Sequence, residues 1–446
     1  MGESTLTKDS ICSSSRSQLC LEFLAVPRLG RSGEQHPISG DLTLGRSPGE
    51  GGLLLDDPGA SRRHAVLRSN RRKSVLELID LGSKNGTYVN GASVQQYFLS
   101  VGDMIRIGDS FLHLGIMPEL QDDPAETDSI PELVGTSPGI RKLQTEIEIA
   151  ASGNLPILIL GETGSGKELA AQAVHRLSAR SGPFLPVNCP AVPETLFESV
   201  FFGHRRGAFT DAREDSLGLI RSADRGTLFL DEIGELGLRN QARLLRFLED
   251  GVVMPVGSAS GVKVDVQLVA ATNANLTCLV EKRRFREDLL ARLEGFVVEI
   301  PALRYRKGDI PGLVHHFARE EGVERVEISP DALEALLCHR WPKNVRSLKS
   351  LVRRLILAAR HNGELEDGAW RVEIENLSTE LQAPIITRSH AGPVAEVCRN
   401  PDGSPTREGL LALLSAHGDV VADVARSLNR DRKQVYRWMK KYDIDR

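Results

Sequence analysis

The sequence predicts a protein of three structural parts: a β-sandwich, an α/β domain with a helical lid, and a small all-α unit. Three observations lead to this fold class. Short strand-like segments separated by turns fill residues 17–115, and a strand, a glycine-rich loop and a helix follow one another at 157–177. Three helix-like segments follow residue 406. A chain of 446 residues has room for about three domains.

The composition excludes several classes of protein. The formal net charge of −4 gives no chain-wide signal for a polyanionic partner. The six cysteines are scattered without CxxC spacing, which argues for reduced thiols and against a zinc site. No apolar run approaches the length of a membrane span, and the polar N-terminal segment lacks the features of a secretory signal. We therefore expect a cytoplasmic protein with no membrane partner.

The first part, residues 17–115, alternates short apolar segments with turns. Strands of this length and spacing are typical of a β-sandwich. The predicted strands are LCLEFLAV, LTLGR, GGLLL, HAVLRS, SVLELIDL, GTYVNG, MIRIGD and SFLHLGI.

Four motifs occur in order within this part. They are Gly45-Arg46, SRRHA at 61–65, DLGSKNGTYVNG at 80–91 and VGDMIRIG at 101–108. An arginine fork joined by hydroxyl, amide and backbone donors on loops is well suited to hold a dianionic phosphate. Together the motifs resemble the forkhead-associated (FHA) domain, a phosphothreonine-binding module.

The FHA resemblance implies which residues contact the phosphate, while His64 and the Asn-Gly turn would brace the loops. The implied phosphate contacts are Arg46, Ser61, Arg62, Asn85 and Thr87. Taken singly, Ser61, Asn85 and Gly86 also fit plain turn formation, because Asn-Gly is a strong hairpin signal. A domain of this fold can also serve only as a docking surface.

An acidic, proline-containing linker is predicted at 116–131, and the second part spans 132–362, with a helical lid from about residue 303. The apolar run at 157–160 leads into GETGSGKE and then into a helical pattern. Backbone N–H groups of such a loop wrap phosphate oxygens, the helix N-terminus adds positive potential, and Lys167 reaches the outer phosphates. The predicted ATP-binding loop is Gly161, Glu162, Thr163, Gly164, Ser165, Gly166, Lys167 and Glu168.

Two adjacent carboxylates, Asp231 and Glu232, end the apolar run TLFL. A buried strand would deliver both to the edge of a sheet, where Asp231 binds Mg²⁺ and Glu232 polarises the attacking water. Glu168 stands where a Ser or Thr commonly binds the metal, so Thr163, Ser165 and water would complete the site. Two solvated acids after a strand are the alternative, which the upstream phosphate loop disfavours.

The segment GAFTDA at 207–212 is rich in small, turn-forming residues. Such a setting does not easily bury an aromatic ring, so an exposed Phe209 suggests a contact with a partner. The segment resembles the loop, usually GAFTGA, of the AAA+ activators of sigma-54 RNA polymerase, the bacterial enhancer-binding proteins. The implied sigma-54 contacts are Gly207, Ala208, Phe209, Thr210, Asp211 and Ala212.

The resemblance to these activators covers residues 133 to about 361 nearly without gaps. Two positions depart from the pattern, because Asp211 replaces the second glycine of the loop motif and Arg225 replaces another glycine. The resemblance implies ATP and Mg²⁺ as cofactors and a homo-oligomeric, hexameric ring.

The resemblance also implies roles for polar residues at strand ends. Asn188 would hold Glu232 until the nucleotide state changes, and Thr272 and Asn273 would sense the γ-phosphate. On the residue pattern alone, Asn188 is as well explained as a polar strand end.

Three arginines complete the implied ATP site. Arg286 and Arg292, six residues apart on a predicted helix, would enter the ATP site of a neighbouring subunit as arginine fingers. Arg346 would point back at the nucleotide as a second sensor. A charged helix face is the alternative for Arg286 and Arg292.

The third part, 406–446, follows a linker predicted at 363–405. Its three helix-like segments have the spacing of a helix-turn-helix and resemble the Fis-type DNA-binding unit. Residues 426–441 contain seven basic residues and one acidic residue, and Val435, Trp438 and Met439 are expected inside. The predicted DNA contacts are Arg430, Arg432, Lys433, Gln434, Arg437 and Lys440. A basic, solvated helix is the alternative.

These parts together predict an ATP-dependent transcriptional activator. It would bind enhancer DNA, hydrolyse ATP in a ring and drive the GAFTDA loop against sigma-54 RNA polymerase, under control of a threonine-phosphorylated protein. Two alternatives stay open: an AAA+ remodeller of another target, which Asp211 allows, and an FHA-regulated DNA-binding protein with a weak ATPase. The intact Lys167, Asp231 and Glu232 speak against the second.

Overall fold

The computed structural model describes most of the first 383 residues and a few segments of the remainder. The described residues are 18–25, 34–70, 75–117, 130–209, 212–363, 365, 369–378, 381, 407, 410, 414, 421, 432–442 and 444. The chain divides into two compact units, Met1–Ala383 and Pro384–Arg446. None of the helices in these ranges combines the length and the apolar character that a membrane span requires.

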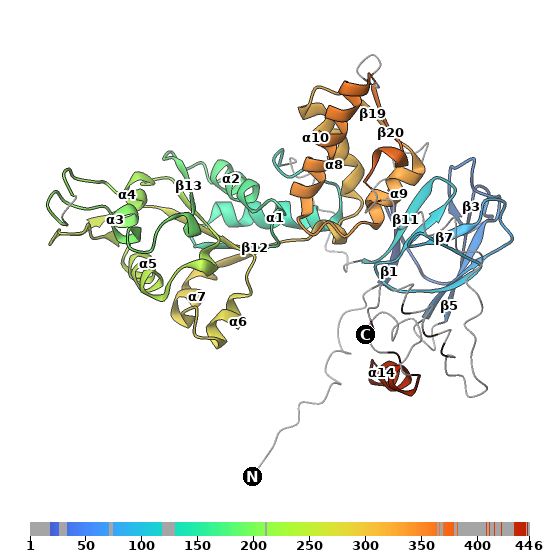
Figure 1. Cartoon of the computed structure of the whole chain (residues 1–446), viewed down its shortest axis with the longest axis horizontal. Helices are drawn as coiled ribbons and strands as arrows, with labels where there is room; N and C mark the ends of the chain where they lie inside the picture. Colours follow the sequence, from blue (N-terminus) through green and yellow to red (C-terminus); the bar gives the residue numbers. More distant parts are fainter. Residues whose placement is uncertain are drawn as a thin grey trace, which may run out of the picture. The chain divides into compact units, whose positions relative to one another are not determined.

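Two sheets form the β-sandwich at the start of the chain (Figure 1). One sheet, in the order β2-β1-β11-β10-β7-β8, contains β1 (Gln18–Ala25), β2 (Gln35–Pro37), β7 (Thr87–Val89), β8 (Ala92–Val94), β10 (Met104–Ile107) and β11 (Ser110–Met117). The other, in the order β4-β3-β5-β6-β9, contains β3 (Leu42–Gly45), β4 (Leu53–Leu54), β5 (Ala65–Asn70), β6 (Val75–Asp80) and β9 (Gln96–Leu99).

Alternate side chains of these strands fill the space between the two sheets. Leu21 and Phe23 of β1 and Leu42 and Leu44 of β3 are buried in one apolar cluster. The predicted β-sandwich is therefore confirmed. Strands β2, β8 and β9 are not among the predicted strands, because they are short and mostly exposed or half-buried, and so lack an apolar alternation.

A parallel five-stranded sheet is the centre of the second domain (Figure 1). Its order is β13-β14-β17-β12-β18, formed by β12 (Ile157–Gly161), β13 (Phe184–Asn188), β14 (Thr227–Asp231), β17 (Gln267–Thr272) and β18 (Phe296–Ile300). Parallel strands covered on both faces form continuous apolar runs, and every residue of β17 is buried. The short strands β15 (Val252–Val253) and β16 (Val262–Lys263) pair beside this sheet as a separate antiparallel ribbon.

Helices cover both faces of the parallel sheet. One apolar cluster joins it to α1 (Pro138–Ser152) and α2 (Lys167–Leu177). The other cluster joins it to the helices α3 (Phe197–Phe202), α4 (Leu219–Ser222), α5 (Leu238–Asp250), α6 (Leu276–Glu281) and α7 (Glu287–Leu293). This layered arrangement brings the carboxyl ends of all five strands to one edge of the sheet.

The lid consists of three helices and a small parallel ribbon. Its elements are α8 (Asp309–Glu320), β19 (Arg325–Ile328), α9 (Pro330–Cys338), α10 (Asn344–Asn362) and β20 (Ala369–Val372). Strand β20 pairs with β19 and buries Trp370, so ordered structure continues into the segment predicted as a linker from residue 363.

The second unit contains one described helix, α14 (Arg432–Lys441). Val435, Trp438 and Met439 are buried, as predicted, against an apolar cluster that includes Leu410 and Leu414. The other two predicted helices lie largely outside the described residues.

Candidate functional site

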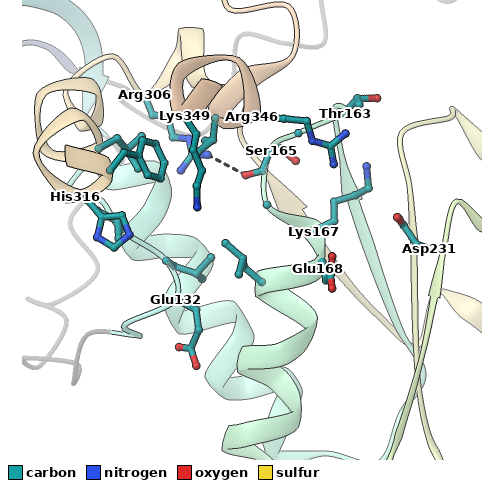
Figure 2. Close-up of a pocket in the computed structure, with 18 of the residues that line it drawn as sticks. Glu132, Thr163, Ser165, Lys167, Glu168, Asp231, Arg306, His316, Arg346 and Lys349 are labelled. Atoms are coloured by element: carbon teal, nitrogen blue, oxygen red, sulfur yellow. Dashed lines mark hydrogen bonds between the residues drawn. The ribbon is translucent and has the colours of Figure 1, made fainter. Parts of the chain in front are cut away.

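A cavity of about 720 Å³ lies where the parallel sheet meets the lid (Figure 2). Residues 163–168 of the glycine loop line one side of it, together with Asn188, Asp231 and Glu232. Arg346 and other lid side chains line the opposite side. The cavity therefore collects most of the predicted ATP-binding residues, which come from four separate strand ends or helix starts.

The glycine loop has the backbone conformation that phosphate binding requires. Gly164 and Gly166 have φ of 76° and 112°, in the left-handed region that glycine adopts without strain. Helix α2 begins at Lys167, so its free N–H groups face the loop. The Lys167 side chain is 7% exposed, and its Nζ donates to the Gly161 carbonyl at 3.1 Å.

The two carboxylates meet Lys167 at the end of β14. Lys167 Nζ lies 3.5 Å from Glu232 Oε1, and the Glu232 N–H donates to Asp231 Oδ1 at 3.1 Å. Burial raises the pKa of Asp231, the neighbouring Glu232 raises it further, and Lys167 acts in the opposite direction. Glu232 has φ of 53°, a strained conformation for a residue with a side chain, and such strain is typical of catalytic positions.

A magnesium ion fits this set of donors. Mg²⁺ binds in nucleotide sites through one or two carboxylates together with the phosphates, and Asp231 and Glu232 supply the carboxylates. Ser165 lines the same cavity, and its buried hydroxyl has no hydrogen-bond partner within the part of the chain that the structure describes. No group of three or more metal-ligating side chains occurs among the described residues, so the phosphates would complete the coordination.

The predicted sensor residues lie close to the loop and to Glu232. Asn273 Nδ2 donates to Thr163 Oγ1 at 2.8 Å, and the Asn273 N–H faces Glu232 Oε2 at 3.3 Å. Thr272 is buried, and its hydroxyl accepts from the Ala274 N–H at 3.0 Å. Asn188 lines the cavity with an exposed side chain, so it is in reach of a nucleotide.

Four of the cavity residues labelled in Figure 2 have no role predicted from the sequence. Arg306 donates to the Ser165 carbonyl at 3.1 Å, as the dashed line in Figure 2 shows, and its side chain is buried. Burial lowers the pKa of Arg306 and Asp309 opposes this shift. The others are Glu132, His316 and Lys349. They come from segments outside the glycine loop and the acidic pair, so only the tertiary structure reveals them.

The two predicted arginine fingers do not line this cavity. Arg286 is the N-cap residue of α7 rather than a member of the helix, and it forms a two-pronged ion pair with Asp288. Arg292 donates from Nε and a terminal nitrogen to the Leu248 carbonyl, at 3.2 and 3.1 Å. Within one chain, then, neither side chain contributes to the lining of the cavity that the same chain forms.

Backbone hydrogen bonds join the described ends of the GAFTDA segment, which lies in the sequence between the cavity residues Asn188 and Asp231. The Gly207 N–H donates to the Ala212 carbonyl at 2.8 Å, and the Ala212 N–H donates to Phe209 at 3.0 Å. The Phe209 side chain is 41% exposed and its ring contacts His204 edge-on, with centroids 4.9 Å apart. Thr210 and Asp211 lie outside the described residues.

The loops of the β-sandwich bring the predicted phosphate-binding residues together. The Arg46 N–H donates to the Ser61 carbonyl at 3.0 Å, and the Lys84 N–H donates to Ser61 Oγ at 3.1 Å. Asn85 donates to the Gly59 carbonyl at 2.8 Å. Arg46, Arg62 and Asn85 are exposed, so their side chains are free to meet a ligand.

Two residues of this region have structural roles. Buried His64 bridges the loops, with Nδ1 accepting from the Ser61 N–H at 3.0 Å and Nε2 facing the Gly86 carbonyl at 3.1 Å, as the predicted brace would. Thr87 is fully buried and its hydroxyl donates to Asp80 at 2.6 Å. Thr87 therefore does not face a ligand, in contrast to the predicted phosphate contact.

The predicted DNA-binding residues fall mainly on α14. Arg437 and Lys440 are exposed on this helix, Gln434 is half-buried, and Arg430 lies outside the described residues. Arg432 and Lys433 are the first two residues of the helix.

Comparison with known families agrees with the fold and with the cavity. Residues 133–299 match the family described as Sigma-54 interaction domain, residues 304–383 match the AAA+ ATPase lid domain, and residues 42–108 match the FHA domain. The DNA-binding transcriptional regulator NtrC of Bradyrhizobium sp. is 45% identical over 346 residues, covering 73% of this chain and 72% of that protein. The chain belongs to the NtrC family of sigma-54-dependent transcriptional regulators.

Two further relatives support this membership. NtrX from Brucella abortus, solved in complex with ATP, is 31% identical with a TM-score of 0.51, covering 70% of this chain and 69% of that one. The anaerobic nitric oxide reductase transcription regulator NorR of Aeromonas hydrophila is 41% identical over 327 residues. This NtrC-family chain spans 64% of that NorR and 55% of the NorR of Aeromonas salmonicida. Its central domain is an AAA+ ATPase domain, preceded by an FHA domain.

Proposed function

We propose that this NtrC-family protein hydrolyses ATP to remodel the closed promoter complex of sigma-54 RNA polymerase. The single observation that carries the proposal is the cavity in which Lys167, Asp231 and Glu232 of a Sigma-54 interaction domain meet Arg346 of its AAA+ lid. ATP and Mg²⁺ would be its cofactors, and a hexameric ring would be its active state.

The chemistry follows from the side chains around the cavity. Loop N–H groups and Lys167 would bind the phosphates, and Asp231 would hold Mg²⁺, which when bound would supply positive charge beside the transferring phosphoryl group. Glu232 accepts a hydrogen bond from the attacking water and orients it. Asn188 and Asn273, at the ends of β13 and β17 on either side of β14, would sense whether the γ-phosphate is present.

The GAFTDA loop would deliver the result of hydrolysis to sigma-54. The exposed ring of Phe209, beside the hydrogen-bonded ends of the loop, supports a contact surface for a partner. The basic C-terminal unit, with exposed Arg437 and Lys440, would bind enhancer DNA. A remodeller of another target remains the second candidate, because Asp211 departs from the usual loop motif.

Open-complex formation tests the proposal. We expect the parent protein, with ATP and sigma-54 polymerase, to melt a sigma-54 promoter, and the Glu232→Gln protein to leave it closed. Melting is measured by permanganate reactivity of unpaired thymines. If the parent hydrolyses ATP and the promoter stays closed, with and without a phosphothreonine peptide, the loop acts on another target.

The FHA domain would make the ATPase respond to a threonine-phosphorylated protein. We expect Arg46→Ala to weaken binding of a phosphothreonine peptide at least about tenfold, because a charge-assisted bond to phosphate contributes about 1.5–3 kcal/mol. Binding is measured by fluorescence anisotropy, and basal ATPase activity should be unchanged.

The Thr87→Val variant is the matched control for the phosphate pocket. It removes the buried hydroxyl that donates to Asp80, which lowers stability by about 1 kcal/mol and leaves the exposed Arg46 in place. Peptide affinity should therefore stay within about twofold of the parent value. If Arg46→Ala left the affinity for the phosphothreonine peptide unchanged, or if Thr87→Val lowered it strongly, the proposed phosphate-binding pocket around Arg46 would be wrong.

A further inference from the structure

Glu162, the second residue of the glycine loop, faces away from the nucleotide cavity. It is not among the residues that line the cavity, although its neighbours Thr163 and Gly164 are. Its carboxylate instead receives both terminal nitrogens of Arg304, one of them at 2.8 Å, and Asn344 Nδ2 at 3.2 Å. The hydrogen bonds from Arg304, and then from Asn344, lower the pKa of Glu162 to about 2, so the carboxylate is ionised at any working pH.

Both partners of Glu162 belong to the lid side of the domain. Arg304 lies in the short 3₁₀ turn Leu303–Tyr305, which connects β18 to the lid. Asn344 is the first residue of α10, is fully buried and has φ of 47°. Its Oδ1 accepts from the Leu303 N–H at 2.8 Å, and its Nδ2 also donates to the Thr163 carbonyl at 3.1 Å. One side chain thus joins the connecting turn, the lid helix and the phosphate loop.

The start of α10 also touches the phosphate loop through its backbone. The Arg346 N–H faces the Gly164 carbonyl at 3.3 Å. A side chain at Gly164 would meet the Lys343 carbonyl at 2.3 Å, so the two backbones are in direct contact. The position of Arg346, which points into the cavity in Figure 2, is therefore fixed by contacts between the loop and the lid.

We infer that Glu162, Arg304 and Asn344 form a latch that holds the lid on the phosphate loop and so positions Arg346 against the phosphates of ATP. Glu162 is a positioning residue in this latch, because it acts on the nucleotide only through the lid. The inference rests on the ATP binding and hydrolysis proposed above.

The residue types match this role. A carboxylate offers two oxygens, so Glu162 can accept the planar fork of Arg304 and the Asn344 amide together. A planar fork fixes direction as well as distance, which a lysine ammonium at position 304 would not. The latch also lies at the connection about which the lid would turn, so a change in lid angle must displace the loop or break these bonds.

A double-mutant cycle tests the latch in the full-length protein. We expect Glu162→Ala to raise the KM for ATP and the Kd for a fluorescent ATP analogue about tenfold, a coupling typical of groups in one hydrogen-bond network. In an Arg346→Ala background the same substitution should change both values by less than about threefold, because the residue that the latch positions is already gone.

Two further variants separate positioning from a loss of folding. Arg304→Lys keeps the positive charge but loses the two parallel hydrogen bonds of the guanidinium group to Glu162. It should therefore raise the KM for ATP, as Glu162→Ala does. Glu324→Ala removes an exposed carboxylate of the lid and should leave KM unchanged. Thermal unfolding of each variant, and Glu162→Gln in place of any unstable one, show that the measured protein is folded.

The outcomes are distinct. A KM effect of Glu162→Ala that shrinks in the Arg346→Ala background supports the latch. An equal effect in both backgrounds, or no effect in either, overturns it. If the parent protein binds the ATP analogue and hydrolyses no ATP, the proposed function fails, and the Kd values alone still decide on the latch.

Discussion

Replacing Glu232 with Gln is expected to lower kcat for ATP hydrolysis at least about 100-fold while ATP still binds. The glutamine keeps the shape of the side chain and removes the charge that orients and polarises the attacking water, a role that contributes about 10²–10⁴ in rate. The phosphate contacts of the loop and of Lys167 are untouched, so the Kd for ATP should change little. Phosphate release and equilibrium nucleotide binding measure the two quantities.

The position of Glu232 makes this substitution informative. Its Oε1 is 3.5 Å from Lys167 Nζ, so removing its charge also removes a weak ion pair to the lysine that we propose binds phosphate. If this ion pair were the main role of Glu232, the glutamine variant would change the Kd for ATP and leave kcat nearly intact. Asp231→Asn is the companion variant, since loss of the proposed Mg²⁺ ligand should lower kcat and raise the Mg²⁺ concentration needed for half-maximal hydrolysis.

Alanine substitution of Arg286 or Arg292 is expected to lower kcat about 10³-fold or more, although neither residue lines the cavity of its own chain. An arginine finger stabilises the charge of the transition state, and in a ring it comes from the adjacent subunit. The Asp288 ion pair that holds Arg286 at the surface is exposed, so releasing the finger costs little.

A mixing experiment distinguishes fingers acting between subunits from a structural role. Arg286→Ala and Lys167→Ala proteins should each be inactive alone. Mixed rings contain interfaces that pair an intact Lys167 site with an intact finger, so mixing should restore ATP hydrolysis. Failure of every mixing ratio to restore activity would indicate that Arg286 acts within its own chain or supports the fold.

Local sequence was sufficient for the glycine loop and for the acidic pair. Gly164, Gly166 and Lys167 act through backbone conformation and position at a helix start, both of which short-range patterns determine. Asp231 and Glu232 directly follow a buried strand, and parallel strands end at the same sheet edge. These residues therefore meet wherever the predicted strands form one sheet.

The lid side of the site could not be predicted in the same way. His316 and Lys349 reach the cavity only because α8 and α10 fold over the loop, and half-buried basic residues on helices are common. Arg306 reaches it from the turn before α8, where no sequence pattern marks it as buried. For Thr87 the resemblance implied a phosphate contact, whereas the structure shows a buried hydroxyl that donates to Asp80. A family resemblance alone does not show which partner a side chain has inside the fold.

Arg225 shows how a departure from a family pattern can be accommodated. Its φ of 58° lies in the left-handed region that glycine adopts without strain, which fits the glycine that the family resemblance implies there. Its N–H donates to the Asp265 carbonyl at 2.7 Å and its carbonyl accepts from Gly182 at 2.9 Å, so the surrounding backbone holds the arginine in a conformation that costs about 1 kcal/mol.

The parallel pair of β19 and β20 determines how short a stable ATPase fragment can be. A fragment that ended at residue 362, the predicted end of the domain, would lose Trp370 and Val372 and leave the edge of β19 unpaired beside a bared apolar surface. Unpaired strand edges and exposed apolar surface promote aggregation. Insolubility of such a fragment would then reflect where the chain was cut, and a fragment that continues through Leu381 would retain the buried residues that close the lid.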